Sequence, residues 1–304
     1  MSNKLHISVC VCTYKRPELL RQLLSKLENQ ETEDRFGYSV VIADNDKSES
    51  ARETVESFAR QSRIRVEYHV EPEQNIALAR NMAVGHATGD FVAFIDDDES
   101  PIDEWLFRMH GALLRYGADG ILGPVKPLFE TPPPQWIVKA GFFERPNSQC
   151  YETGFVLDWK QTGTGNVLVR RGVFNEVAGP FNREFGSGGE DFDFFRRAMN
   201  LSKVFVWCEE ATVYEIVPVE RTRLSFQLRR ALLRGKASLA SPAGDAIGIA
   251  KSFVACALYT AMLPIFLMMG RHVFAKYLIS ACDHIGKLLA ACGIEVVKDK
   301  YILK

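Results

Sequence analysis

The sequence predicts an α/β fold with a mostly parallel sheet that helices cover on both faces. Two observations predict it. Short apolar segments alternate with amphipathic helical patterns through the first 125 residues, as in chains built from strand–helix–strand units. These segments are apolar at nearly every position, which is typical of strands buried on both sides. In such a sheet, ligands bind beyond the carboxyl ends of the strands.

The elements of this amino-terminal part follow from local patterns. Runs of apolar and β-branched residues that end at polar residues predict the strands. Apolar residues spaced by three and four predict the helices, and Pro17 stands at the favoured first helical position of one of them. The expected strands cover residues 7–12, 39–43, 64–69, 91–95 and 121–125. The expected helices cover residues 17–27, 49–61, 75–87 and 103–116.

The alternation stops between residues 126 and 160, where Thr131 precedes three consecutive prolines. This segment is expected to be a long irregular loop that shapes or covers a pocket. Regular structure is expected to return with strands over residues 166–170, 203–207 and 212–216 and a helix over residues 192–199.

The composition excludes several classes of protein. A hydrophobic content of 47% is ample for a core, and a formal net charge of -1 argues against a general nucleic-acid binder. The seven scattered cysteines predict reduced thiols in a cytosolic compartment, and Cys10 and Cys12 lack the spacing of a zinc ribbon. The six histidines have no ligand spacing, so they are expected to be structural or exposed. The amino terminus has no signal-peptide pattern, which predicts that this part stays in the cytosol.

Two acidic clusters carry the chemistry. The expected strand 91–95 runs into Asp96-Asp97-Asp98-Glu99, and consecutive carboxylates repel one another unless a cation lies among them. This cluster predicts a divalent-metal site, although Asp and Ser also favour strand-end turns and helix caps. The second cluster, Glu190-Asp191, follows Gly186-Ser187-Gly188-Gly189, which lets a backbone approach a ligand closely. We expect it to face the same cleft.

The carboxy-terminal part differs in kind. Residues 221–236 hold six Lys or Arg and no acid among regularly spaced leucines, which predicts a basic amphipathic segment. Residues 252–270 are uncharged and almost wholly apolar, which is just long enough to span a bilayer, and Pro264 interrupts them. Basic residues flank both ends, so orientation stays open. The alternatives are a spanning helix, a re-entrant or interfacial hairpin, and a buried helix of a carboxy-terminal subdomain.

Residues 5–220 resemble the family-2 glycosyltransferases, which have the GT-A fold. Within them the chain is most similar to bacterial exopolysaccharide glucosyltransferases of the succinoglycan type. The motifs that carry the resemblance are Val9-Cys10-Val11-Cys12-Thr13-Tyr14-Lys15-Arg16-Pro17, Ala43-Asp44-Asn45-Asp46, Asn75-Ile76-Ala77-Leu78-Ala79-Arg80-Asn81, Gly89-Asp90 through Asp98, and Gly188-Gly189-Glu190-Asp191. It implies a GT-A domain over residues 1–220, with a nucleotide-binding half at about 1–125 and an acceptor half at about 126–220. Residues 221–304 would be a helical membrane-associating region.

The resemblance also implies roles on the donor side of the site. Thr13 and Arg16 would line the nucleotide pocket, and Asp44 would accept a hydrogen bond from the base. Arg80 would lie against the nucleotide or its phosphates. Asp96 would hold the ribose or the metal, and Asp98 the Mg²⁺ or Mn²⁺ ion that bridges the phosphates.

On the acceptor side, Asp191 would be the catalytic base of a single displacement that inverts the anomeric carbon. The implied donor-sugar contacts include Asn166, Glu190 and the backbone of Gly163, Gly165, Gly188 and Gly189. Glu215 stands where relatives often carry a histidine that reaches the metal or the diphosphate. The chain has Gln227-Leu228-Arg229-Arg230 in place of the Gln-x-x-Arg-Trp motif of processive relatives, which favours addition of one sugar per encounter.

The function implied is metal-dependent transfer of a hexose, glucose from UDP-glucose, to a polyprenyl-diphosphate-linked oligosaccharide in exopolysaccharide biosynthesis. It would take place at the cytoplasmic face of the bacterial inner membrane, with no nucleic-acid partner. A rhamnosyl or galactosyl transferase of O-antigen or lipopolysaccharide-core assembly would have nearly the same motifs. A nucleotidyltransferase would show a Gly-rich basic loop after the first strand, which residues 13–17 lack. A degenerate membrane-bound scaffold would not need Asp96, Asp98 and Asp191.

Overall fold

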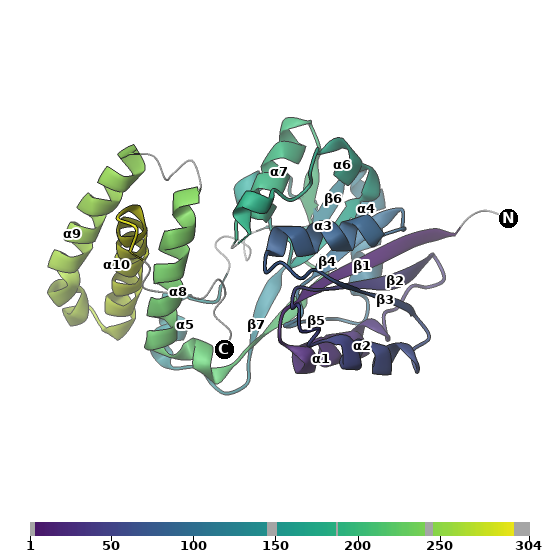
Figure 1. Ribbon diagram of the computed structural model, residues 1–304, viewed down its shortest axis with the longest axis horizontal. Helices are drawn as coiled ribbons and strands as arrows, with labels where there is room; N and C mark the ends of the chain where they lie inside the picture. Colours follow the sequence, from purple (N-terminus) through teal and green to yellow (C-terminus); the bar gives the residue numbers. More distant parts are fainter. Residues whose placement is uncertain (1–3, 145–150, 187, 241–245, 295–304) are drawn as a thin grey trace. The chain divides into compact units, whose positions relative to one another are not determined.

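The computed structural model describes residues 4–144, 151–186, 188–240 and 246–294 (Figure 1). Contacts divide the chain into two compact units. One contains the described residues of Met1–Lys126 and Arg145–Ile216, and the other contains those of Pro127–Glu144 and Val217–Lys304. The two acidic clusters both belong to the first unit.

A seven-stranded sheet forms the centre of the first unit, and its strand order is β3-β2-β1-β4-β8-β6-β9. The pairs β1–β2, β2–β3, β1–β4 and β6–β9 are parallel, whereas β8 is antiparallel to both β4 and β6. This confirms the expected mostly parallel sheet. The strands are β1 (Leu5–Thr13), β2 (Phe36–Asp44), β3 (Arg65–Val70), β4 (Phe91–Ile95), β6 (Gly120–Leu122), β8 (Asn166–Arg170) and β9 (Phe205–Trp207).

Helices pack on both faces of this sheet because successive strand residues point to opposite sides. In β1, Val9 and Val11 join one apolar cluster and Cys10 joins the other. The first cluster is shared with α1 (Pro17–Leu27), α2 (Arg52–Ala59) and α4 (Trp105–Tyr116). The second is shared with α3 (Ile76–His86), α6 (Arg171–Glu176) and α7 (Glu190–Asn200). Figure 1 shows α3, α6 and α7 on one side of the sheet and α1 and α2 on the other.

Local signals fix the ends of the helices. Pro17 starts α1, where its missing N–H is not needed. Asn75 caps α3, because its side-chain oxygen accepts hydrogen bonds from the backbone N–H groups of Ala77 and Leu78 at 3.0 and 3.2 Å. Gly117 ends α4 in the left-handed region with φ of 59°.

The structure corrects two expectations about residues 121–160. The expected strand 121–125 is two strands, β6 and β7 (Val125–Phe129), because the chain turns at Gly123 and Pro124. A Cβ at Gly123 would lie 2.3 Å from the carbonyl oxygen of Ala211, and Pro124 has no N–H for a ladder. The segment 126–160 is not wholly irregular, since it contains β7, α5 (Gln135–Ala140) and the 3-10 turn η2 (Trp159–Gln161). Residues 145–150 lie outside the described residues.

A small three-stranded sheet has the order β5-β10-β7. Its other strands are β5 (Glu99–Pro101), which the sequence did not predict, and β10 (Val213–Val217), which was expected one residue earlier. β5 and β10 are antiparallel, with Glu215 opposite Glu99. The last residue of the acidic cluster after β4, Glu99, is therefore the first residue of β5.

The second unit is mainly three helices, α8 (Leu224–Ala237), α9 (Ala246–Met268) and α10 (Arg271–Ala291). α8 and α10 cross closely because glycines stand at the contact. A Cβ at Gly235 would lie 2.0 Å from the carbonyl oxygen of Asp283, and one at Gly286 would lie 2.2 Å from that of Leu232. Within the described ranges, the 3-10 turns besides η2 are η3 (Arg183–Phe185), η4 (Val219–Thr222) and η5 (Ser238–Ala240).

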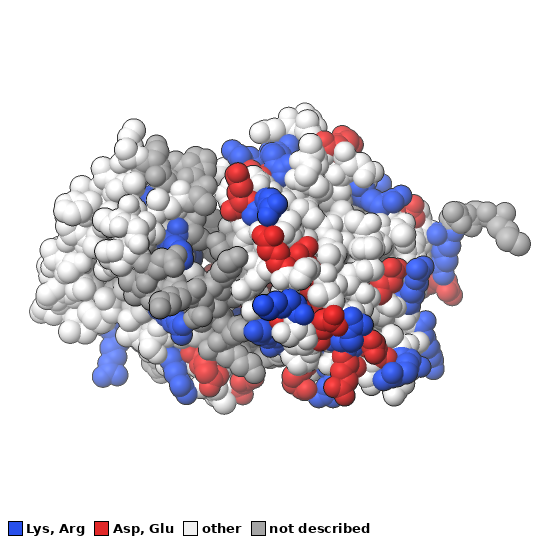
Figure 2. All heavy atoms as spheres, viewed as in Figure 1, with Lys and Arg blue, Asp and Glu red and all other residues white. Residues whose placement is uncertain are grey.

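α9 is long and apolar enough to cross a membrane, and among the described residues it alone meets these criteria. It has 23 residues, and its most apolar window has a mean hydropathy of 1.7 with 6% of that window buried. Most of α9 is thus exposed within the described part of the chain, unlike a buried core helix. Figure 2 shows a broad uncharged surface over these helices. The exposed apolar residues of α9 are Ile247, Phe253, Val254, Leu258, Met262, Ile265, Leu267 and Met268.

Candidate active site

The acidic cluster after β4 is held by residues from the end of β1. Asp97 is buried and accepts hydrogen bonds from the Thr13 hydroxyl at 2.8 Å and from Arg16 Nη1 at 3.0 Å. The same nitrogen of Arg16 lies 3.1 Å from Oδ2 of Asp98. The positive charge of the guanidinium thus offsets the negative charges of two of the three neighbouring carboxylates.

Asp97 was not among the predicted site residues, although it lies at the centre of this network. Burial raises the pKa of Asp97, Arg16 lowers it, and neighbouring Asp98 raises it again, for a value of about 7. Its side chain is 6% exposed, whereas that of Asp96 is 44% exposed. Asp96 to Asp98 lie between β4 and β5 outside any strand, and Asp97 and Asp98 both contact Arg16, so no periodic pattern in the sequence marks Asp97.

Arg80 connects the two acidic clusters. Its Nη2 atom is 3.7 Å from Oδ1 of Asp96, and its Nη1 atom forms an ion pair with the carboxylate of Glu190. Arg80 and Glu190 are both buried. The structure therefore brings the end of β4, the middle of α3 and the start of α7 together at one place, as expected from the sequence.

One carboxylate oxygen of Glu190 accepts no hydrogen bond from the described residues. Its Oε2 atom is buried and has no hydrogen-bond partner among the described residues. A buried carboxylate oxygen without a donor is unfavourable, and such atoms are rare unless a ligand completes them. This oxygen has no accessible surface, so a ligand hydroxyl reaches it only when the residues around it move.

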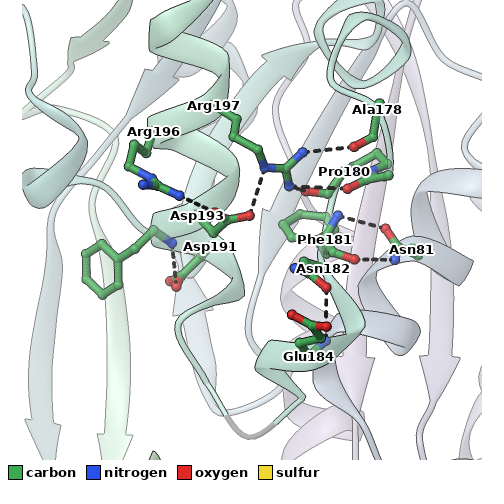
Figure 3. Close-up of polar contacts among 12 residues, drawn as sticks. Asn81, Ala178, Pro180, Phe181, Asn182, Glu184, Asp191, Asp193, Arg196 and Arg197 are labelled. Carbon is green, nitrogen blue, oxygen red and sulfur yellow. Dashed lines mark hydrogen bonds and ion pairs between the residues drawn. The ribbon is translucent and has the colours of Figure 1, made fainter. Parts of the chain in front are cut away.

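Asp191 lies on the first turn of α7, after Gly188 and Gly189 with φ of 127° and 96°. Such values suit glycine, and they turn the chain into the helix. Asp191 is half-buried, and its Oδ1 atom accepts a hydrogen bond of 2.8 Å from the backbone N–H of Phe192 (Figure 3). Ser187 lies outside the described residues.

The loop before α7 is fastened to α7 and α3 (Figure 3). Arg197 donates to the carbonyl oxygens of Ala178, Gly179 and Pro180 at 2.6 to 3.2 Å. Asn81 of α3 exchanges two hydrogen bonds with the backbone of Phe181. The last turn of α7 and the helix that carries Arg80 are thereby both tied to this loop.

Gly186 completes this attachment by lying directly against the cap of α3. A Cβ at Gly186 would come within 2.4 Å of the Asn75 side chain, and the N–H of Ile76 donates to the Gly186 carbonyl oxygen at 3.2 Å. The glycine segment thus positions the second acidic cluster through backbone contacts.

Asp44 lies at the end of β2 as predicted, but its carboxylate is already bonded within the protein. It accepts hydrogen bonds from the N–H groups of Asp46 and Ala51 and from the Tyr68 hydroxyl at 2.8 to 3.0 Å, with no exposed surface. Burial raises the pKa of Tyr68, as does its bond to Asp44. A nucleotide base can therefore donate a hydrogen bond to Asp44 only if one of these three donors moves away.

Asn166 is a structural residue in this arrangement. It accepts from Trp105 Nε1 at 2.7 Å and donates to the carbonyl oxygens of Pro124 and Ala211 at 3.0 and 2.7 Å. The residue is 1% exposed. Its side chain has no surface for the sugar contact expected from the sequence. Gly165, just before β8, is buried as well.

Glu215 lies near the first acidic cluster. Its register partner across β5 and β10 is Glu99, and the N–H of Ile216 donates to the carbonyl oxygen of Asp98 at 2.8 Å. Directly opposed residues of an antiparallel pair share one face of the sheet. The strand that carries Glu215 thus borders the candidate metal ligands.

The donor set after β4 fits a hard divalent cation. Asp96 and Asp98 offer carboxylate oxygens, which Mg²⁺ and Mn²⁺ prefer. Asp97 does not fit, because its oxygens are turned to Thr13 and Arg16.

Comparison with known proteins places the chain in a family. The model of glycosyl transferase family 2 matches residues 8–177. Over 234 residues, the chain is 35% identical to the succinoglycan biosynthesis protein ExoM of Rhizobium meliloti (strain 1021), covering 76% of this chain and 74% of that protein. A GalNAc(5)-diNAcBac-PP-undecaprenol beta-1,3-glucosyltransferase of Campylobacter jejuni is 27% identical over 94 residues, 31% of this chain and 29% of that protein.

Among solved structures, residues 1–349 of S. aureus TarS in complex with UDP-GlcNAc align with a TM-score of 0.56 at 16% identity. The alignment covers 97% of this chain and 94% of that one. This likeness in fold, together with the family match, confirms the expected GT-A fold.

Proposed function

Because the chain belongs to glycosyl transferase family 2 and is therefore a glycosyltransferase, we propose that it transfers a hexose, glucose from UDP-glucose, to a lipid-linked oligosaccharide. The transfer inverts the anomeric carbon and serves exopolysaccharide assembly. The similarity to the succinoglycan protein supports the pathway, and the Campylobacter relative, a glucosyltransferase whose name includes PP-undecaprenol, supports the sugar and the acceptor.

The observation that carries the proposal is the position of Arg80 between Asp96 and Glu190. A transferase needs the leaving diphosphate and the attacking hydroxyl on opposite sides of one sugar. Arg80 has on one side the first acidic cluster, which would hold the metal and the diphosphate, and on the other side the second cluster, which carries the proposed base. This placement supports such an arrangement.

On the donor side, Thr13 and Arg16 line the nucleotide pocket, and Arg80 lies against the diphosphate. Asp44 accepts a hydrogen bond from the base once one of its three present donors has moved. Asp96 and Asp98 hold Mg²⁺ or Mn²⁺. This ion, when bound, would neutralise the charge that develops on the departing nucleoside diphosphate.

On the acceptor side, Asp191 takes the proton of the attacking hydroxyl. Its position on the first turn of α7 suits this role, because a carboxylate within hydrogen-bond reach of the acceptor is sufficient. The Oε2 atom of Glu190, which has no partner among the described residues, accepts a bond from a sugar hydroxyl once the residues around it have moved, with Gly189 leaving room for the sugar.

The carboxy-terminal region 221–304 attaches the enzyme to the cytoplasmic face of the bacterial inner membrane, and residues 1–220 form the catalytic domain. The exposed apolar surface of α9 and the basic residues of α8 support this division. Basic residues near an apolar helix favour anionic lipid and the phosphates of a polyprenyl-diphosphate acceptor.

The test uses membranes that contain the protein. They are incubated with UDP-glucose, UDP-galactose or dTDP-rhamnose, with or without lipid-linked acceptor, and nucleoside diphosphate release is measured. We expect release with UDP-glucose that needs the acceptor and Mg²⁺ or Mn²⁺ and that stops with EDTA. Asp98→Asn should lose the metal response, whereas Asp103→Asn, an exposed acid just after the cluster, should keep it.

Faster release with the galactosyl or rhamnosyl donor would contradict the choice of glucose. Release that EDTA leaves unchanged would contradict the metal-dependent mechanism.

A further inference from the structure

A second group of ligand-type side chains lies on the outer strand of the main sheet. In the register of β2 and β3, Glu67 pairs with Val41 and His69 pairs with Ala43. Val41 and Ala43 belong to the apolar cluster that packs against α3. Glu67 and His69 therefore point to the same side of the sheet as α3, because paired residues of parallel strands share a face.

The last residue of α3 completes the group. The ring of His86 stacks on that of His69 with a centroid distance of 3.5 Å and an interplanar angle of 10°. One potential ligand atom from each of Glu67, His69 and His86 lies within 4.8 Å of the others. Three ligand-type atoms from two elements thus lie close together, although these histidines have no ligand spacing in the sequence. Because imidazole binds a metal in its ring plane, the exposed ring of His86 turns out of the stack when both histidines bind one ion.

Glu67 and His69 are less exposed than His86, and both have contacts that favour binding of a cation. The Nε2 atom of His69 is buried and has no hydrogen-bond partner among the described residues, and it lies 3.6 Å from Oε2 of Glu67. Arg65 lies 3.2 Å from the other oxygen of Glu67 and so orients the carboxylate.

We propose that Glu67, His69 and His86 bind one transition-metal ion of the Zn²⁺ class. Two imidazoles and one carboxylate are a known type of zinc ligand set, which leaves a fourth position for water. Imidazole ligands favour Zn²⁺, Ni²⁺ and Cu²⁺ over Mg²⁺. The site is therefore chemically different from the oxygen-only pair Asp96 and Asp98.

The bound ion ties β3 to the end of α3. β3 is an edge strand of the sheet, and its only strand neighbour in the order of the main sheet is β2. The same helix carries Arg80, so the ion also fixes the carboxyl end of the helix that positions Arg80. Because the ion binds the folded protein, it stabilises the protein against unfolding.

The experiment uses the full chain without a histidine tag, in detergent, with Cys292→Ser to remove an exposed thiol, because thiolates are also zinc ligands. Zn²⁺ binding is measured by calorimetry, and Co²⁺ is added as a spectroscopic probe of imidazole ligation. We expect one equivalent of Zn²⁺, a rise in the thermal midpoint with Zn²⁺, and no rise with Mg²⁺ alone.

His86→Ala is the decisive variant, because His86 is exposed and its removal does not disturb the core. It should weaken Zn²⁺ binding by at least about tenfold, since one of three protein ligands is lost. Glu67→Gln should weaken binding as well, and the matched control His272→Ala should leave it unchanged. Equal Zn²⁺ affinity in His86→Ala and the parent protein, or no binding at all, would overturn the proposal.

Discussion

The Thr13 hydroxyl donates a hydrogen bond of 2.8 Å to Oδ2 of Asp97, so the end of β1 is fastened to the residues that follow β4. Both residues are buried. Arg16 strengthens the contact from the loop after β1. The acidic cluster is thus anchored by Asp97, both of whose oxygens accept hydrogen bonds, while Asp98 shares Arg16 with it and Asp96 has the most exposed side chain of the three.

Asp97→Ala should destabilise the protein, because it leaves the Thr13 hydroxyl and part of the Arg16 guanidinium without an acceptor. A loss of about 1–3 kcal/mol in the free energy of unfolding is expected from an orphaned buried donor. Asp97→Asn should lose less, since the amide oxygen still accepts from Thr13. Urea unfolding of the two variants measures the difference, and equal stability of Asp97→Ala and the parent protein would contradict this anchoring role.

Asp191→Asn should abolish transfer while leaving donor binding intact. The amide has nearly the same shape but cannot take a proton, so we expect turnover to fall by at least about a hundredfold with donor affinity nearly unchanged. Nucleoside diphosphate release and calorimetry with the donor measure the two quantities. Glu184→Gln, an exposed acid in the preceding loop, is the control and should keep full turnover. Full turnover of Asp191→Asn would exclude Asp191 as the base.

Gly235→Ala and Gly286→Ala should each destabilise the helical unit. The added methyl group would meet a backbone carbonyl at 2.0 or 2.2 Å, and α8 and α10 must move apart to relieve it. Overpacking of this kind costs about 1–3 kcal/mol. Gly111→Ala in α4 meets nothing within 4 Å and, as a matched control, should be neutral or stabilising. Thermal unfolding followed by circular dichroism distinguishes them, and unchanged melting of both crossing variants would refute the close contact.

His110 should make the protein less stable in mild acid. Burial lowers the pKa of His110, as do Arg35 and Arg170, and the ring packs between Phe36 and Phe91. The unfolded chain therefore binds the proton more readily. Stability is complete above the unfolded pKa of about 6.5 and falls as the pH drops below it, by about 1.4 kcal/mol for each unit of pKa difference.

His110→Phe removes this titration and should flatten the dependence of the free energy of unfolding on pH. Urea unfolding at about pH 7.5 and 5.5 brackets the unfolded pKa of histidine. A variant that loses as much stability on acidification as the parent protein would show that His110 is not responsible.

Local sequence patterns were sufficient to predict most strands of the main sheet. They also predicted that the two acidic clusters lie close together. Strand 91–95 and strand 166–170 match β4 and β8, because each is a short apolar run bounded by polar residues. The strand-end rule placed Asp96 at the ligand-binding edge of the sheet, and the glycines before Glu190 predicted that the second cluster faces the same cleft. Neither prediction needed long-range contacts to be known.

The structure differs from the sequence-based expectations where tertiary contacts decide the role of a residue, because such contacts have no signature in the local sequence. Asn166 looks like a polar residue beside a glycine-rich loop, but Trp105 and two distant carbonyl groups take all its hydrogen bonds. Glu67 and His86 come together only because α3 folds back across β3. Asp97 was passed over since a run of identical acids does not show which member faces inward.

The reversed direction of β8 sets which parts of this enzyme can change during evolution. Its first residue, Asn166, pairs with Ile95 at the end of β4, so the segment 151–165 that leads into β8 arrives beside the acidic cluster. Under the proposed function, lengthening or shortening that segment alters what surrounds the sugar and leaves the pairing of β4 with β8 intact. New donor and acceptor preferences would then arise by insertion there, without remodelling of the strands proposed to bind the nucleotide.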